Sequence, residues 1–178
     1  MTLSLRDPRT LHELLNYRLV CLYAASTAPV TRLMEGRWGI SRREWRLLAL
    51  LATHGPLAPS VLAERAQLDR PRTSRAITSL VAKRLAERAA ERGDARRARI
   101  ALTRAGRQLY DEIFPQVAAM NARVVAALDD AATQAFDQAL ARLTAEAVRL
   151  NAEIAQDVRA DRRAGGSRRI RGWPDRQG

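Results

Sequence analysis

The spacing of apolar residues changes once along this chain, and that change limits what the chain can fold into. Over residues 88–102 apolar and other positions alternate with the period of a β-strand, the apolar ones being Ala98, Ile100 and Leu102. Gly93 and Asp94 supply a turn within this stretch. Over the rest of residues 11–158 apolar residues recur every three or four positions, which is the period of an amphipathic helix. The pattern predicts a mainly helical chain with one β-hairpin.

Residues typical of helix ends divide the helical part. Ser41 and Glu44 have the S-x-x-E spacing of a capping box, and His54-Gly55-Pro56 ends the helix that they open. Asp69 and Thr103 have the positions of N-caps. The predicted helices cover about 11–35 (interrupted or bent near Pro29), 42–54, 59–66, 70–87, 104–128 (bent near Pro115) and 130–159.

Composition and motifs exclude several classes of protein. A hydrophobic share of 47% in 178 residues is enough for one folded core, and no apolar run reaches the roughly 18 to 20 residues of a membrane span. Met1–Arg9 has no apolar stretch typical of a signal peptide, so we expect a cytoplasmic protein. One cysteine and two histidines are too few for a typical four-ligand zinc site. No nucleotide-binding loop, nucleophile elbow or zinc-protease motif is present, so neither an enzyme nor a cofactor is predicted.

The positive charge is unevenly distributed along the chain. The net charge is +12, and 30 of the 31 basic residues are arginine, with Lys83 the only lysine. A GC-rich genome would enrich arginine, but it would not separate the charges. Residues 58–104 hold 12 basic and 5 acidic residues, whereas residues 105–158 hold 4 and 8. We therefore expect the segment 58–104 to face a polyanion.

Helix, turn, helix and hairpin in this order predict a winged helix-turn-helix over about residues 41–103. At about 100° per residue, helix 70–87 buries one arc and exposes the other. The predicted inner arc holds Thr73, Ile77, Leu80, Val81 and Arg84, and the outer arc holds Arg72, Arg75, Ser79 and Ala82, with Pro71 and Thr78 at its edge. Arginine on such a helix can bond guanine in the major groove, and an Arg-rich hairpin tip suits the minor groove. Taken alone, the helix is also compatible with a solvated amphipathic helix.

In this region the sequence resembles the MarR family of bacterial transcription regulators. The matching residues are Leu62-Ala63-Glu64-Arg65, Leu68, Ser74-Arg75-Ala76-Ile77, Leu80-Val81 and the wing signature formed by Asp94, Arg96, Ile100, Leu102, Thr103 and Gly106. The order and lengths of the predicted helices match over about residues 10–158. The chain departs from the family at Thr73, where an apolar residue is common, and in its tail after residue 160.

The resemblance implies a mainly helical homodimer with two lobes. The dimerisation lobe combines helices at about 11–36 and 104–158, in agreement with the long apolar helices at both ends of the chain. Residues 1–10 are an expected arm, residues 11–158 the MarR-type domain, and residues 159–178 a basic, disordered tail. Two interpretations of the tail are open: it reinforces binding to DNA phosphates, or it is a charged end that keeps the protein soluble.

The resemblance also implies which residues bind a palindromic DNA operator. Those assigned to the major groove are Pro71, Arg72, Arg75, Thr78 and Ser79. Arg96 would enter the minor groove. Arg97 is the second arginine of the wing, and Asp94 would orient both. Asp94 is alternatively a turn residue without a role in binding. Arg97 and Arg99 are alternatively solvated residues of a strand that do not contact DNA. A nonspecific DNA-compacting protein is the alternative to a repressor.

Two switches are implied by members of the family. Many bind small aromatic or phenolic anions, for which Tyr17 and Arg18 on the first helix and Trp45 and Arg46 on the second provide aromatic and cationic groups. The alternative places Trp45 in the core and the arginines on the surface. Peroxide-sensing members carry a cysteine four residues before a tyrosine, whereas Cys21 lies two before Tyr23. A buried, inert Cys21 is therefore favoured over a thiol sensor.

Overall fold

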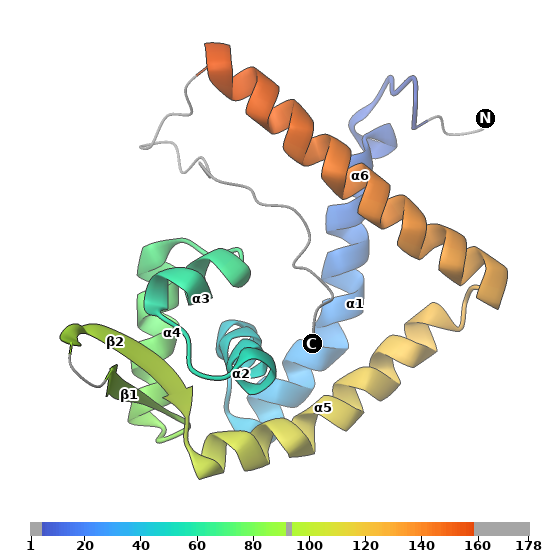
Figure 1. Cartoon of the computed structure of the whole chain (residues 1–178). Coiled ribbons are helices and arrows are strands. Elements are labelled where there is room, and N and C mark those ends of the chain that lie inside the picture. Colours follow the sequence, from blue (N-terminus) through green and yellow to red (C-terminus); the bar gives the residue numbers. More distant parts are fainter. Residues whose placement is uncertain (1–4, 92–93, 159–178) are drawn as a thin grey trace.

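The computed structural model describes the backbone of residues 5–91 and 94–158, and the side chains of residues 5–89 and 99–158. A short 3₁₀ helix, Leu11–Glu13, precedes six α-helices and one antiparallel hairpin. The elements are α1 (Leu15–Trp38), α2 (Arg42–His54), α3 (Pro59–Arg65), α4 (Arg70–Ala82), β1 (Ala86–Glu91), β2 (Asp94–Leu102), α5 (Arg104–Val125) and α6 (Asp130–Asp157). Figure 1 shows α2, α3, α4 and the hairpin gathered in one lobe, from which α1 and α5 lead away. This is a mainly helical, winged helix-turn-helix architecture, as predicted.

The predicted caps are present and explain where the helices begin. The Ser41 hydroxyl accepts the amide of Glu44 at 3.3 Å, and the Glu44 carboxylate accepts the amide of Ser41 at 2.6 Å, which completes the capping box. Asp69 accepts the amide of Arg72 at 2.7 Å at the start of α4. Thr103 accepts the amide of Gly106 at 3.0 Å at the start of α5. Each cap satisfies a helix-start amide that has no partner within its own helix.

Two predicted helix boundaries are wrong. Helix α1 begins at Leu15 rather than near Leu11, because the chain breaks at Leu14, and it is not interrupted at Pro29, where an interruption or a bend was predicted. Helix α4 ends at Ala82 rather than near Glu87, because Arg84 takes a left-handed conformation with φ of 57°. The amide of Leu85 then bonds back to the carbonyl of Leu80, as in a Schellman motif. Arg84 is consequently exposed instead of facing inward.

The core of the lobe is formed by the inner faces of α2 and α4. Its fully buried apolar residues are Leu47, Leu48, Leu51, Leu62, Ile77, Leu80 and Ile100. Thr73, the residue at which the chain departs from the family pattern, is also buried, and its hydroxyl donates to the carbonyl of Asp69 at 2.9 Å. The base of the hairpin is held by a bridge in which Leu57 and Ile100 exchange backbone hydrogen bonds. The core thus positions α4 and the wing together.

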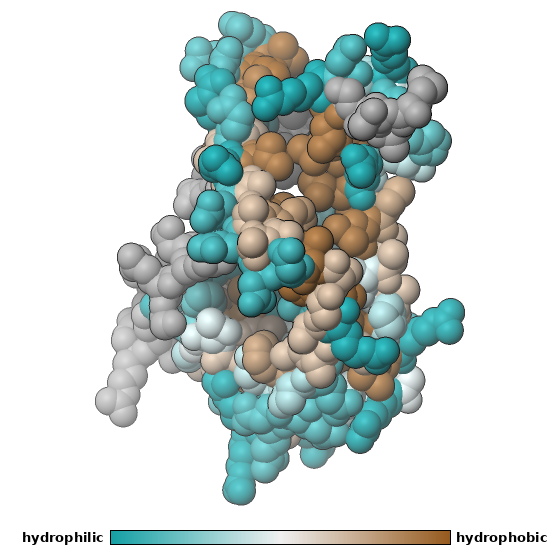
Figure 2. All heavy atoms as spheres, turned by 90° about the vertical axis from the view of Figure 1, so that its right-hand side faces the viewer, coloured by the Kyte–Doolittle hydropathy of each residue, from teal (hydrophilic) through white to brown (hydrophobic). Residues whose placement is uncertain are grey.

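Helix α6 and the adjoining parts of α1 and α5 carry an exposed apolar surface. No residue of α6 is buried, and Phe136, Leu143, Leu150 and Ile154 are each between 43% and 50% exposed. The surface continues with Val20 and Leu22 on α1 and with Phe114 and Val124 on α5. Figure 2 shows apolar residues gathered over the upper half of this face. Among the described residues, no helix has the length and hydropathy needed to cross a membrane.

Candidate functional site

The outer face of α4 presents polar and basic residues to solvent, as predicted. Pro71, Arg72, Arg75 and Thr78 are exposed, whereas Thr73, Ala76, Ile77 and Leu80 are buried against the core. The Asp69 cap and the packed inner face hold the helix so that its outer residues project from a rigid support. A rigid helix with an outward-facing guanidinium has the geometry for reading bases in a major groove.

The two arginines of this face have different surroundings. The Nε of Arg72 lies 3.2 Å from a carboxylate oxygen of Asp69, the same residue that caps the helix. The Nε of Arg75 lies 3.4 Å from the carbonyl oxygen of Pro71, a weak bond at the end of an exposed side chain. Arg75 therefore loses little when it turns toward another acceptor, whereas Arg72 must exchange an ion pair.

Ser79 lies at the boundary between this face and α2. It is half-buried, and its hydroxyl donates to the Glu44 carboxylate at 2.8 Å. Lys83 donates to the same carboxylate oxygen at 2.7 Å and to the carbonyl of Gly39 at 2.7 Å. The structure therefore joins Ser79 to a polar cluster between the end of α1, the start of α2 and the end of α4.

Glu44 is the centre of this cluster, of which the sequence predicted the capping box alone. Its side chain is 6% exposed. Burial on its own would raise the pKa of this carboxyl, but the hydrogen bonds from Lys83, from Ser41 and from Ser79 outweigh burial and lower the pKa. Glu44 is therefore ionised at neutral pH and fixes the C-terminal half of α4 on α2. The one available signal was that the only lysine of the chain, Lys83, directly follows α4.

The wing is an antiparallel hairpin with the predicted position. Its register pairs Ala86 with Leu102 and Arg88 with Ile100, and Asp94 begins β2. The side chains of the predicted wing residues Asp94, Arg96 and Arg97 lie outside the described residues. Two further arginines of the hairpin, Arg88 and Arg99, are exposed.

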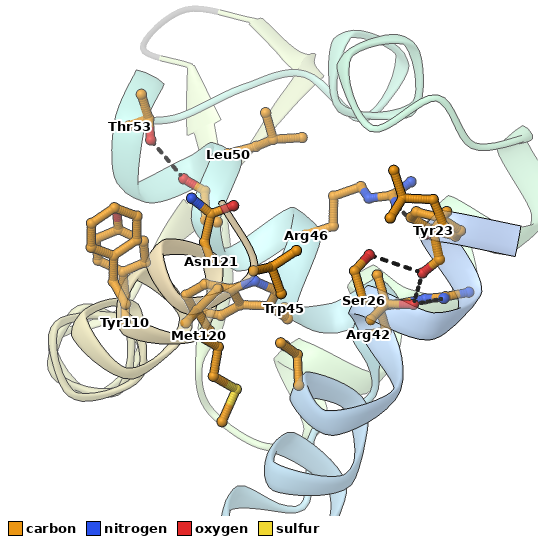
Figure 3. Close-up of a pocket in the computed structure, with 17 residues that line it drawn as sticks. Tyr23, Ser26, Arg42, Trp45, Arg46, Leu50, Thr53, Tyr110, Met120 and Asn121 are labelled. Atoms are coloured by element: carbon orange, nitrogen blue, oxygen red, sulfur yellow. Dashed lines mark hydrogen bonds between the residues drawn. The ribbon is translucent and has the colours of Figure 1, made fainter. Parts of the chain in front are cut away.

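A cavity of about 630 Å³ lies between α1, α2 and α5 (Figure 3). Arg46 donates to the Tyr23 hydroxyl at 2.9 Å, and the Arg42 guanidinium lies 5.0 Å from the centre of the Tyr23 ring. Trp45 and Tyr110 stack with their ring centres 5.7 Å apart on another part of the lining. None of the described lining residues is acidic. The cavity thus combines two cationic groups with aromatic surface.

The cavity includes half of the predicted effector residues. Trp45 and Arg46 line it, but Tyr17 and Arg18 do not, and the Tyr17 ring packs edge-on against His12 with centres 5.1 Å apart. Tyr23 and Arg42 line the cavity without having been assigned to it. The prediction of a buried Cys21 is wrong, because its thiol is exposed on α1.

The comparisons with known proteins agree with this geometry. Residues 38–97 match the sequence model of the MarR family. A MarR-family transcriptional regulator from Silicibacter pomeroyi is 28% identical, with 77% of this chain and 92% of that chain covered at a TM-score of 0.66. NadR in complex with 4-hydroxyphenylacetate is 27% identical, with 77% and 96% covered at a TM-score of 0.64.

A further structure supports the fold alone. MepR of S. aureus, in a complex with DNA, is 20% identical, with 75% of this chain and 98% of that chain covered at a TM-score of 0.69. No curated protein sequence matches the chain at a significant level. The match to the family model includes the helix-turn-helix and most of the wing. In sequence and in fold, the chain is therefore similar to transcriptional regulators of the MarR family.

Proposed function

We propose that the chain is a cytoplasmic, homodimeric transcriptional repressor that binds a palindromic DNA operator. The observation that carries the proposal is the exposed Arg75 on the outer face of α4, in a segment with an excess of basic residues. In this arrangement α4 enters the major groove and the wing reaches the adjacent minor groove. The residues assigned to the major groove are Pro71, Arg72, Arg75, Thr78 and Ser79, and those assigned to the wing are Asp94, Arg96 and Arg97.

The dimer is proposed from the apolar surface of α1, α5 and α6. Large apolar side chains that remain exposed on three long helices are typical of a subunit interface. A second copy of the same surface would cover them around a twofold axis, and two copies of α4 would then meet successive major grooves. The proposed dimerisation segments are about 11–36 and 104–158, and the DNA-binding segment is about 41–103. Light scattering is expected to give twice the subunit mass of 19.8 kDa, and a monomer would contradict the proposal.

Arg75→Ala is expected to weaken binding to the operator by about 1 to 3 kcal/mol, because it removes a direct contact to a base. The operator is obtained by selecting duplexes from a random pool with the wild-type protein, and binding is measured by fluorescence anisotropy. Arg96→Ala is expected to lose a similar amount. Arg142→Ala, an exposed arginine of α6, is the matched control and should bind like the wild type.

A footprint separates the repressor from a DNA-compacting protein. The repressor should protect a palindrome with half-sites about 10 bp apart. Uniform coverage of any duplex, together with wild-type affinity for Arg75→Ala and Arg96→Ala, would contradict sequence-specific binding.

We further propose that an aromatic or phenolic anion binds in the cavity between α1, α2 and α5 and relieves repression. The support is the pairing of Arg42 and Arg46 with the aromatic surface of Trp45 and Tyr110. NadR, a protein of the same fold at 27% identity, was crystallised with 4-hydroxyphenylacetate. A carboxylate would meet the guanidiniums, and an aromatic ring would pack on the apolar lining.

Binding of 4-hydroxyphenylacetate and benzoate is expected to change the fluorescence of Trp45. Arg42→Ala should weaken this binding about tenfold, since a hydrogen bond to a charged group contributes about 1.5 kcal/mol. Arg18→Ala is the matched control on α1, and Trp45→Phe shows whether the signal comes from the cavity. Equal affinities of the Arg42 and Arg18 variants, or no response to any aromatic acid in a broader panel, would contradict this site.

A further inference from the structure

A second hollow lies between α3, α4 and β1, in the lobe formed by α2, α3, α4 and the hairpin. Its volume is about 360 Å³. The side chains that line it are Pro59, Ser60, Arg70, Thr73, Ser74, Ile77 and Arg88. It shares no lining residue with the cavity between α1, α2 and α5. It is therefore a separate site from that cavity.

Two arginines from different elements make this hollow positive. Arg70 comes from the first turn of α4, and Arg88 comes from β1, opposite Ile100 in the hairpin. Both are exposed, and neither takes part in the ion pairs found among the described residues. Nothing acidic lines the hollow, so its charge is uncompensated among the described residues. Two unpaired guanidiniums facing one space attract an oxyanion.

Hydroxyl groups add neutral donors beside the two arginines. Ser60 on α3 and Ser74 on α4 line the hollow, and Ser74 is exposed. The hydroxyl of Thr73 is already engaged with the carbonyl of Asp69. Guanidinium groups together with serine hydroxyls form a donor set that suits a phosphate.

The hollow occupies a particular side of α4. At about 100° per residue, the exposed arc lies opposite the buried residues of α4, so Thr78 is near its centre beside Arg75 and not at its edge as predicted. Arg70 and Ser74 lie on one edge of this arc. Ser79 lies on the other edge, toward α2, where it bonds Glu44. The edge with Arg70 and Ser74 is the one that faces the hairpin, because Arg88 of β1 lines the same hollow.

If α4 enters the major groove and the wing enters the next minor groove, one sugar-phosphate strand must pass between them. That strand separates the two grooves in any B-form duplex. We infer that the hollow binds a backbone phosphate of this strand, with Arg70 and Arg88 as charged donors and Ser60 and Ser74 as neutral ones. The inference rests on the proposed DNA binding and adds to it a sequence-independent contact that sets the spacing between α4 and the wing.

Arg70→Ala and Arg88→Ala are each expected to weaken DNA binding about tenfold on both the selected operator and a scrambled duplex of the same length. The slope of log affinity against log salt should fall by about 1 for each variant, because one phosphate contact is lost. The preference for operator over scrambled duplex should stay unchanged, in contrast to Arg75→Ala. Arg88→Lys should keep the wild-type slope, Arg142→Ala is the matched control, and thermal melting confirms that every variant is folded.

The outcomes distinguish this site from the proposed function as a whole. Wild-type affinity and salt slope in both alanine variants would overturn the phosphate site, even where the wild type prefers the operator. A wild-type protein that binds operator and scrambled duplex equally well would contradict the proposed repressor. In that case the salt slopes of the variants on the scrambled duplex still test whether Arg70 and Arg88 bind a phosphate. Stabilisation of the wild type but not of Arg88→Ala by inorganic phosphate, with no change in DNA binding, would assign the hollow to a free anion and overturn the inference.

Discussion

Gly106→Ala is expected to lower the free energy of unfolding by about 3 kcal/mol, a large loss for one methyl group. A Cβ atom at this position would lie 1.9 Å from the carbonyl oxygen of Leu85 and 2.9 Å from its carbonyl carbon. That backbone has little room to move, since the same oxygen accepts the amide of Thr103 and the amide of Leu85 bonds Leu80. Any shift would separate the start of α5 from the base of the wing.

Gly36→Ala is the matched control for this prediction. Gly36 lies within α1, and a Cβ there would meet no atom within 4 Å. Alanine is favoured over glycine inside a helix, so this variant should gain about 0.8 kcal/mol. Urea unfolding of both variants and the wild type at one protein concentration measures the difference. Equal midpoints for Gly106→Ala and the wild type would show that α5 does not pack on Leu85 as described.

Glu44→Ala is expected to cost about 3 kcal/mol of stability, because it removes hydrogen bonds to a charged acceptor from two elements and the capping box of α2. The Ser79 hydroxyl would lose its acceptor, and Lys83 would keep only the carbonyl of Gly39. Since Ser79 and Lys83 hold the end of α4, the variant should also bind the operator more weakly. Calorimetric melting and fluorescence anisotropy measure the two effects.

The contribution of Glu44 depends on pH in a defined direction. Folding lowers its pKa from the ordinary value of 4.5, so the unfolded chain binds more protons in acid. The stabilisation is complete above that value and is lost as the pH falls through the lower pKa of the folded state. Glu44→Gln should therefore be less stable than the wild type at neutral pH, and the gap should close in acid. Glu87→Gln, at an exposed strand position, is the control, and parallel pH curves for Glu44→Gln and the wild type would contradict the cluster.

The features predicted correctly depend on neighbours in sequence. The capping box at Ser41 and Glu44, the cap at Asp69 and the alternation around Ile100 are complete within a few residues, so local chemistry predicts them. The end of α4 was misplaced because Arg84 adopts a left-handed conformation that favours glycine. The packing of Leu85 and Ala86 into the lobe outweighs the local cost of that conformation.

The candidate sites were likewise predicted correctly where they depend on neighbours in sequence and only in part where they depend on contacts between helices. The outer face of α4, with Arg75 and Thr78, follows from helical periodicity. The cavity between α1, α2 and α5 was predicted only in part, because Tyr23 and Arg46 belong to different helices and their contact depends on how α1 crosses α2.

The amino-acid sequence by itself determined the order of the elements, the caps, the exposed arc of α4 and the family resemblance, because each depends on residue types at short spacing. The tertiary structure alone decided that Glu44 holds Ser79 and Lys83, that Tyr23 meets Arg42 and Arg46, and that Arg70 and Arg88 share one hollow. These groups are brought together by the burial of a common apolar core, whose packing angles no periodicity along the chain encodes.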